Sequence, residues 1–107
     1  MISIEEFQKL DLRVGTITKV EQHPNADKLY VLKVNFKEEE RQIVAGLKQY
    51  YTEKELLNKQ ITVIMNLEPA KLRGIESQGM LLATDSKDGR VAILTPDKKI
   101  ENNSKIR

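Results

Sequence analysis

The chain has 107 residues, of which 39% are hydrophobic and 32% charged, a composition typical of a globular domain and not of a disordered or membrane-embedded chain. It contains no cysteine, which excludes a disulfide scaffold and a thiolate metal site. Its net charge is only +2, so binding to nucleic acid would require the positive charge to gather on one face.

The length of the chain suffices for one domain and not for two, so residues 1–107 are expected to form a single domain. No apolar run approaches the ~20 residues that cross a bilayer. The first residues lack the basic start and apolar run of a signal peptide. We therefore expect a cytoplasmic protein without a membrane partner.

A short helix is predicted at the start of the chain. Ser3 is a suitable N-cap, and the apolar residues Ile4, Phe7 and Leu10 are spaced three apart, on one face of a helix over Ile4–Leu10. The pattern then changes, because β-branched residues dominate the next stretches. The first three strands are predicted over Leu12–Gln22, Leu29–Phe36 and Arg41–Ala45.

The second half of the chain is predicted to begin with a helix. Thr52 and Glu55 match a capping box, in which each side chain accepts a hydrogen bond from the other residue's backbone amide, so a helix is predicted over Thr52–Leu57. Further strands are predicted over Gln60–Leu67, Gly79–Thr84 and Val91–Leu94, the last after an Asp88-Gly89 hairpin turn.

Three strands, a helix and two or more strands are the order of an all-β OB-fold. That fold is a five-stranded Greek-key barrel with the helix between strands three and four. The short N-terminal helix and a C-terminal extension would lie outside the barrel. Another small β-rich sandwich or barrel is the alternative that this pattern leaves open.

Several motifs, taken in order, resemble one known family. The resemblance is carried by Asp11–Gly15, His23–Tyr30, Arg41–Leu47 and Asn66–Met80. These segments resemble the tRNA-binding domain family, which includes the C-terminal or β-subunit domain of methionyl-tRNA synthetase and free-standing tRNA-binding proteins. The resemblance runs from about Ile4 to the C-terminus, and the ending Ser104–Arg107 is similar to the methionyl-tRNA synthetase branch.

Two positions depart from the family pattern. The family often has glycine before the final Ser-Lys-Ile, where this chain has Asn103. Because asparagine tolerates the left-handed backbone region better than other non-glycine residues, we expect Asn103 to occupy that region. The family often has serine where this chain has Ala45, so no polar role is assigned there.

The resemblance implies that Ser77, Gly79 and Met80 form the contact motif for tRNA. They end the segment 66–80, which joins two predicted strands and is expected to be an exposed loop on the binding face. Considered without the family, Met80 fits a place in the core better than a contact with RNA.

Other residues of this segment carry suitable chemistry. Lys71 and Arg73 can contact phosphates, and the planar guanidinium of Arg73 can also stack on a base. Asn66 can hydrogen-bond to a phosphate or to a 2′-hydroxyl, the group that distinguishes RNA from DNA. Taken singly, a solvated loop is the alternative for both basic residues.

The remaining candidates are weaker. Arg13, Lys28, Arg41 and Lys48 are secondary candidates for contacts with RNA, each with a solvated surface charge as the alternative. Tyr30, Tyr50 and Tyr51 are candidates either for stacking on bases or for the core. His23 is the only histidine, and without a cysteine or carboxylate cluster it fits a structural role in a turn. No metal site and no cofactor are predicted.

The resemblance implies a non-catalytic module that recognises the shape of folded tRNA, near its outer corner as the family does. It would assist an aminoacyl-tRNA synthetase of the methionyl type, as a β subunit or C-terminal domain. A peptide-binding, export chaperone-like protein and a dimerisation module of a synthetase are the alternatives.

A homodimer is predicted from the two ends of the chain. Its candidate residues are Ile4, Phe7, Leu10, Ile100 and Ile106, which are apolar and lie outside the expected barrel. The alternative is that both ends fold back onto their own barrel.

Overall fold

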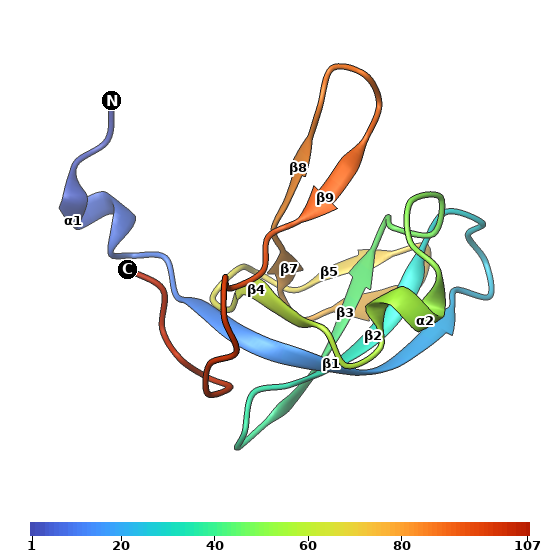
Figure 1. Ribbon diagram of the computed structural model, residues 1–107, viewed down its shortest axis with the longest axis horizontal. Helices are drawn as coiled ribbons and strands as arrows, with labels where there is room; N and C mark the ends of the chain where they lie inside the picture. The colour runs from blue at the N-terminus through green and yellow to red at the C-terminus, as the bar shows by residue number, and fades with distance from the viewer.

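A computed structural model describes all residues, 1–107, and shows a β-barrel with two short helices and two hairpins attached to it (Figure 1). The barrel strands are β1 (Leu12–Gln22), β2 (Tyr30–Asn35), β3 (Glu40–Ala45), β4 (Gln60–Ile64) and β7 (Met80–Leu81). Helix α1 (Ile4–Phe7) precedes them, and α2 (Glu53–Leu56) joins β3 to β4. Two hairpins complete the fold, β5 (Ala70–Leu72) with β6 (Ile75–Ser77) and β8 (Ala83–Asp85) with β9 (Val91–Ile93).

The five barrel strands are ordered β3-β2-β1-β4-β7, and each pair is antiparallel. The long strand β1 makes the sheet curl, because its first half pairs with β4 and its second half with β2. Polar groups at the end of β6 close the gap back to β3. The amide of Gln78 donates to the Gln42 carbonyl across 2.8 Å, and the Gln42 amide donates to the side-chain oxygen of Gln78, also across 2.8 Å. The result is the nearly closed barrel predicted from the strand order.

Apolar side chains fill the barrel. The fully buried ones include Ile17, Leu32, Val34, Phe36, Ile43, Leu56, Ile61 and Val63. Each large aliphatic or aromatic side chain removed from water in this way contributes roughly 1.5–3 kcal/mol. Leu56 is the buried residue of α2, so the helix closes one end of the barrel as an OB-fold requires. Gly15 is needed because a Cβ there would lie 2.6 Å from the Phe36 ring.

Helix α1 is shorter than the predicted Ile4–Leu10. The capping box of Ser3 and Glu6 forms, as the Thr52–Glu55 box does in α2. Beyond α1, however, the amides of Lys9 and Leu10 donate to carbonyls three residues back, which is a tighter turn than an α-helix. A helix with no buried residue lacks the packing that would extend it.

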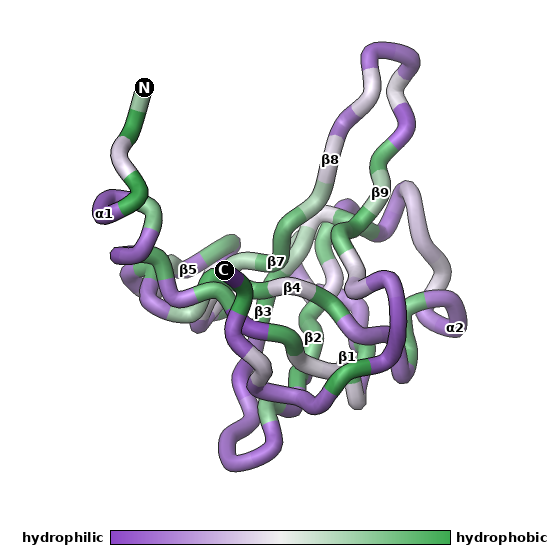
Figure 2. Tube along the Cα trace, turned by 60° about the vertical axis from the view of Figure 1, so that its left-hand side comes forward, coloured by the Kyte–Doolittle hydropathy of each residue, from purple (hydrophilic) through white to green (hydrophobic).

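The predicted strand over Gly79–Thr84 is interrupted at Leu82. The Leu82 amide donates to Thr62 of β4, and its carbonyl accepts from the Leu94 amide, so the chain leaves the barrel at this residue. It then forms the β8–β9 hairpin, which stands away from the barrel in Figure 1 and has a hydrophilic tip in Figure 2. The predicted Asp88-Gly89 turn lies at that tip, with Gly89 at φ +88°.

The C-terminal segment folds back along β1. The Val14 amide donates to Ser104 across 3.0 Å, and the Val14 carbonyl accepts from Asn103 across 2.7 Å. Asn103 has φ +76°, which confirms the left-handed conformation predicted for it. The two ends of the chain therefore meet on one side of the barrel (Figure 1).

No helix is both long and apolar enough to cross a membrane.

Candidate nucleic-acid interface

The segment expected as a loop over residues 66–80 contains the two-stranded hairpin β5–β6. Leu72 pairs with Ile75, which leaves Arg73 and Gly74 as a two-residue turn. Both turn residues have positive φ, +53° and +92°, the conformation of a type I′ turn. Glycine adopts this conformation without strain, whereas an arginine there costs about 1–2 kcal/mol. The hairpin therefore presents Arg73 at its tip at some cost in stability.

His23 ties this hairpin to the turn between β1 and β2. Its ring is buried, its Nε2 lies 2.9 Å from the Leu72 carbonyl oxygen, and its Nδ1 accepts from the Asn25 amide across 3.0 Å. Since a carbonyl can only accept, Nε2 is the donor to Leu72. The structural turn role predicted for His23 is confirmed, and it extends to a second segment of the chain.

Three basic residues gather at this end of the barrel. Arg73 Nε donates to the Asn25 carbonyl across 3.4 Å, and Arg73 and Lys28 line the same shallow hollow. The backbone amide of Lys48 donates to the Lys28 carbonyl, which brings the β3–α2 loop beside the β1–β2 turn. None of the three forms an ion pair, since all ion pairs of the chain involve other basic residues. Their charges are free to meet phosphates.

An apolar groove of about 450 Å³ adjoins this basic group. Its walls come from the end of β3, the β3–α2 loop, the β5–β6 hairpin and the base of the β8–β9 hairpin. Three of its residues are large, apolar and exposed: Tyr50 (44%), Leu72 (38%) and Met80 (49%). Met80 is therefore a surface residue, as the family resemblance implied, and not a core residue.

Ser77 is buried, so the prediction that it lies in an exposed loop is wrong. Its hydroxyl accepts from the Val44 amide across 3.0 Å and donates to the Gly79 carbonyl across 2.8 Å. The bond from Val44 belongs to the seam between β3 and β6 that closes the barrel, and the bond to Gly79 fixes the chain just after β6. Gly79 has φ +145°, and a Cβ there would lie 2.9 Å from the Ile64 carbonyl oxygen. These two residues hold Met80 in the groove by shaping the backbone before it.

Two further candidates of this segment lie away from the groove. Successive side chains of a strand point to opposite faces, so Lys71 faces away from Leu72 and lies opposite Glu76 on the paired strand. The Asn66 amide group is engaged on both sides, accepting from the Asp11 amide and donating to the Lys9 carbonyl. Contact of Lys71 and Asn66 with tRNA stays a prediction.

Two of the secondary candidates have structural partners. Arg13 donates to Asp11 across 2.7 Å and to the Asn103 side chain across 3.0 Å. The hydrogen bond from Arg13 lowers the pKa of the Asp11 carboxyl. Arg41 pairs with Glu39 and donates to the backbone carbonyl of Met65. Both guanidinium groups brace the barrel, whereas Lys28 has no such partner and Lys48 Nζ donates only to the uncharged Gln22 side chain.

The three tyrosines also divide into two that support the fold and one that is exposed. Tyr30 is buried, its hydroxyl donates to the Tyr51 carbonyl, and burial raises its pKa. The hydroxyl of Tyr51 accepts from the Ile93 amide, so it joins the barrel to β9. Only Tyr50 is exposed and free of such bonds.

A separate hollow near Arg41 is lined by Glu39, Glu40 and Glu76. The negative charge of these carboxylates makes the hollow unsuited to binding phosphate.

The barrel topology, with one end that is both basic and partly apolar, defines an OB-type binding domain. The family described as "Putative tRNA binding domain" matches residues 12–105. The chain belongs to this family.

The relatives agree with this assignment. The methionine–tRNA ligase of Pyrococcus furiosus is 57% identical over 106 residues, which are 99% of this chain and 14% of that protein. This chain is therefore homologous to a small region of methionine–tRNA ligases. The structure of a MetRS-related protein from Pyrococcus horikoshii superposes with a TM-score of 0.94, at 33% identity, over 100% of this chain and 98% of that one. The CsaA chaperone protein of Picrophilus torridus gives 0.90 at 34% identity over 100% of both chains.

Sequence reasoning missed three features of this interface. It missed the β5–β6 hairpin. Glycine as the second residue of a tight turn is a hairpin signal, but arginine is an unusual first residue there, so the turn was not recognised. It missed the link from His23 to Leu72, for which no sequence signal exists. It also did not single out Tyr50 among the tyrosines, since exposure depends on the fold.

Proposed function

We propose that this chain binds folded tRNA with the end of the barrel that carries Lys28, Lys48 and Arg73. The proposal rests on one observation above others. These three residues come from separate loops, lie at the same end of the barrel and form no ion pair. The chain that carries them belongs to a tRNA-binding family. A nearly neutral chain that gathers free cations at one end is suited to a limited number of phosphate contacts.

The bound tRNA would be passed to a methionine–tRNA ligase. The chain would act without a catalytic step of its own, by raising the effective concentration of tRNA near a synthetase, either within the same polypeptide or as a separate subunit. Its homology to a region of methionine–tRNA ligases supports this role. A cytoplasmic site of action is consistent with it, because aminoacylation takes place where tRNA and synthetase meet.

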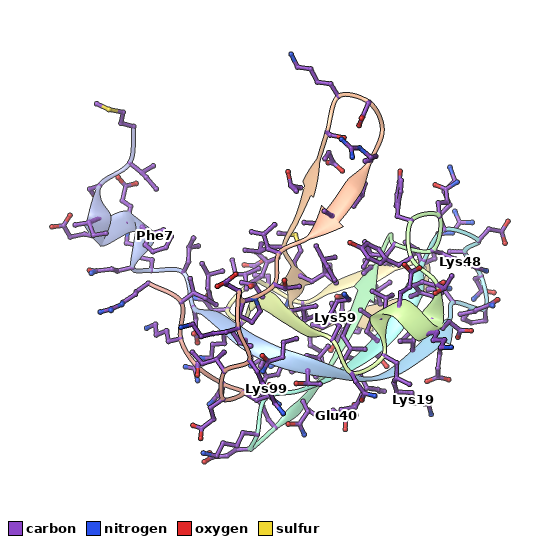
Figure 3. All side chains as sticks on the ribbon, in the orientation of Figure 1. Phe7, Lys19, Glu40, Lys48, Lys59 and Lys99 are labelled. Carbon is purple, nitrogen blue, oxygen red and sulfur yellow. The ribbon has the colours of Figure 1, made fainter.

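A mobility-shift assay tests tRNA binding. Unfractionated tRNA should bind more tightly than an unstructured RNA of equal length, with a log–log salt slope of roughly −0.7 to −0.9 per phosphate contacted. Replacing Lys28, Lys48 and Arg73 by alanine should abolish most of the affinity and flatten the slope. Lys99→Ala is the matched control, since Lys99 is an exposed lysine on the C-terminal segment (Figure 3). Equal affinity for both RNAs would reject recognition of tRNA shape.

A homodimer through the chain ends is the second part of the proposal. A groove of about 390 Å³ on this side is lined by Ile4, Phe7, Leu10 and Ile106. Ile4 and Leu10 are exposed, and α1 buries no residue, so this apolar surface lacks a cover within the chain. Ile100 lies apart, where its backbone bonds to Gln60. Phe7 and Lys48 are at opposite ends of the molecule (Figure 3), so a dimer would leave both RNA sites open.

Light scattering tests the dimer. Point variants are preferable to truncation, because the C-terminal segment bonds to β1 and its removal would uncover that strand. The wild-type chain should have twice the 12.3 kDa mass at tens of micromolar, and Ile4→Glu with Phe7→Ser should have the single mass. Leu94→Glu, an exposed apolar residue elsewhere, is the control. A wild-type monomer would reject the dimer.

Peptide binding is the alternative function. The likeness to a CsaA chaperone protein and the exposed apolar groove favour it. A denatured polypeptide that competes with tRNA for the chain would support this alternative. Competition by inorganic polyphosphate alone would instead support the basic residues as the binding site.

A further inference from the structure

We infer that the apolar groove between the β3–α2 loop and the β8–β9 hairpin takes the base of a single unstacked nucleotide. The neighbouring basic residues would hold the phosphates on either side of that nucleotide. This inference rests on the proposed binding of tRNA and adds a ligand class to it. The RNA would be recognised by an exposed loop base as well as by the shape of its backbone.

The apolar character of the groove is the first reason. Phosphate contacts alone require only a basic surface, and exposed apolar groups add nothing to them. Tyr50, Leu72 and Met80 are nevertheless all exposed and lie around one hollow. Its volume of about 450 Å³ falls in the range of roughly 300–1,000 Å³ typical of small-molecule sites. An aromatic ring with a polarizable thioether nearby is a suitable surface for the face of a base.

The distribution of charge is the second reason. Arg73 and Lys48 directly follow the groove residues Leu72 and Leu47, and Lys28 lines a neighbouring hollow together with Arg73. The β8–β9 hairpin contributes Asp85 to the lining of the groove, a carboxylate that can accept from an exocyclic amino group of a base. A nucleotide matches this polarity, since its phosphate is anionic and its base edge carries donors. An apolar peptide would leave the three cations without partners.

The rigidity of the walls is the third reason. Leu72 is held through its carbonyl by buried His23, and Met80 follows Gly79, whose carbonyl accepts from Ser77, the residue that bonds to Val44 of β3. Arg73 is kept in a left-handed turn that a residue such as asparagine would occupy more readily. A site held in its binding geometry loses less conformational entropy when a ligand binds. RNA loops supply the ligand, because their bases can be turned out of the stack, unlike those of a duplex.

A tryptophan at position 50 tests the inference directly. The chain has no tryptophan, so Tyr50→Trp places a single fluorophore in the groove while preserving an aromatic surface. Unfractionated tRNA should quench it, with the same midpoint as the mobility shift. Leu67→Trp is the matched control, because Leu67 is equally exposed but lines the acidic hollow. Its fluorescence should not change.

Affinity measurements separate the groove from the basic residues. Tyr50→Ala and Met80→Ala should each weaken binding of tRNA by roughly 5- to 150-fold, the range of base–aromatic stacking contacts. Tyr50→Phe should bind like the wild type. Neither alanine variant should change the salt slope, since no phosphate contact is removed, whereas Arg73→Ala should reduce its magnitude by about 0.7–0.9. Melting curves like that of the wild type would show that the exposed substitutions leave the fold intact.

Three results would overturn the inference. Wild-type tRNA affinity in Tyr50→Ala and Met80→Ala, together with unquenched Tyr50→Trp, would exclude the groove while leaving the proposed function in place. Quenching of Tyr50→Trp by an apolar peptide of about 15 residues but not by tRNA would assign the groove to polypeptide. Failure of the wild-type chain to shift tRNA would instead reject the proposed function, and this inference with it.

Discussion

His23 Nε2 donates a hydrogen bond to the Leu72 carbonyl across 2.9 Å, and these residues are 49 positions apart in the chain. The bond joins the turn between β1 and β2 to the hairpin whose tip is Arg73. Because Arg73 also reaches back to the Asn25 carbonyl, the two segments are tied together at two points. The position of Arg73 relative to Lys28 therefore depends on a side chain that is itself buried.

Replacing His23 by alanine should weaken tRNA binding without touching a basic residue. The Leu72 carbonyl and the Asn25 amide would both lose their partner, and the hairpin tip would move more freely. A cost of about 1–3 kcal/mol in unfolding free energy is expected for the unpaired groups. His23→Gln keeps a donor for Leu72 and should restore most of the affinity. If His23→Ala melts earlier yet binds tRNA like the wild type while folded, the residue is structural only.

Arg73→Asn should stabilise the domain and weaken its binding to tRNA. Asparagine tolerates positive φ better than arginine does, so the turn would relax by about 0.5–1 kcal/mol. The loss of the guanidinium would remove a phosphate contact and flatten the salt dependence. Thermal melts and mobility shifts on the same preparation measure both effects. A variant that loses stability would show that Arg73 is held by contacts stronger than its single bond to Asn25.

Ser77→Ala should destabilise the fold, whereas the neighbouring Glu76→Ala should not. The Val44 amide loses its acceptor in the first variant, and it lies in the buried seam that closes the barrel. Leaving such a donor unpaired costs about 1–3 kcal/mol. Glu76 is exposed and serves as the control. Denaturant unfolding gives the difference, and equal midpoints for the two variants would contradict the role of the Ser77 hydroxyl.

The pair of Asp11 and Arg13 should make stability depend on pH in the acid range. The pKa of Asp11 is lower in the folded chain than the usual value of about 3.9, because Arg13 donates to its carboxylate. The contribution of the ionised Asp11 carboxylate to the free energy of unfolding is therefore complete above that value and is lost as the pH falls through the lower pKa of the folded chain. Asp11→Asn should be less stable than the wild type at pH 7, and the difference should shrink as the pH falls below the usual carboxyl pKa and vanish once the carboxyl is protonated in the folded chain too. A difference that persists there would show that the carboxylate charge is not its source.

The sequence by itself determined the strand order and the family. The motifs from Asp11 to Met80 carry the family, and the alternation of β-branched residues with two capping boxes marks the elements. These signals are local, because hydrophobic period, caps and turns depend on residues within a few positions of one another. Even the conformation of Asn103 followed from its residue type and its place in a motif.

The tertiary structure alone decided which polar residues support the fold and which are free to bind. Arg13 and Lys28 look alike in the sequence, yet Asp11 and Asn103 engage only the first. Ser77 stands in the contact motif, but its hydroxyl is used by Val44, a residue 33 positions away. Exposure and pairing arise from contacts between distant segments, and no local pattern encodes which segments meet when a sheet curls into a barrel.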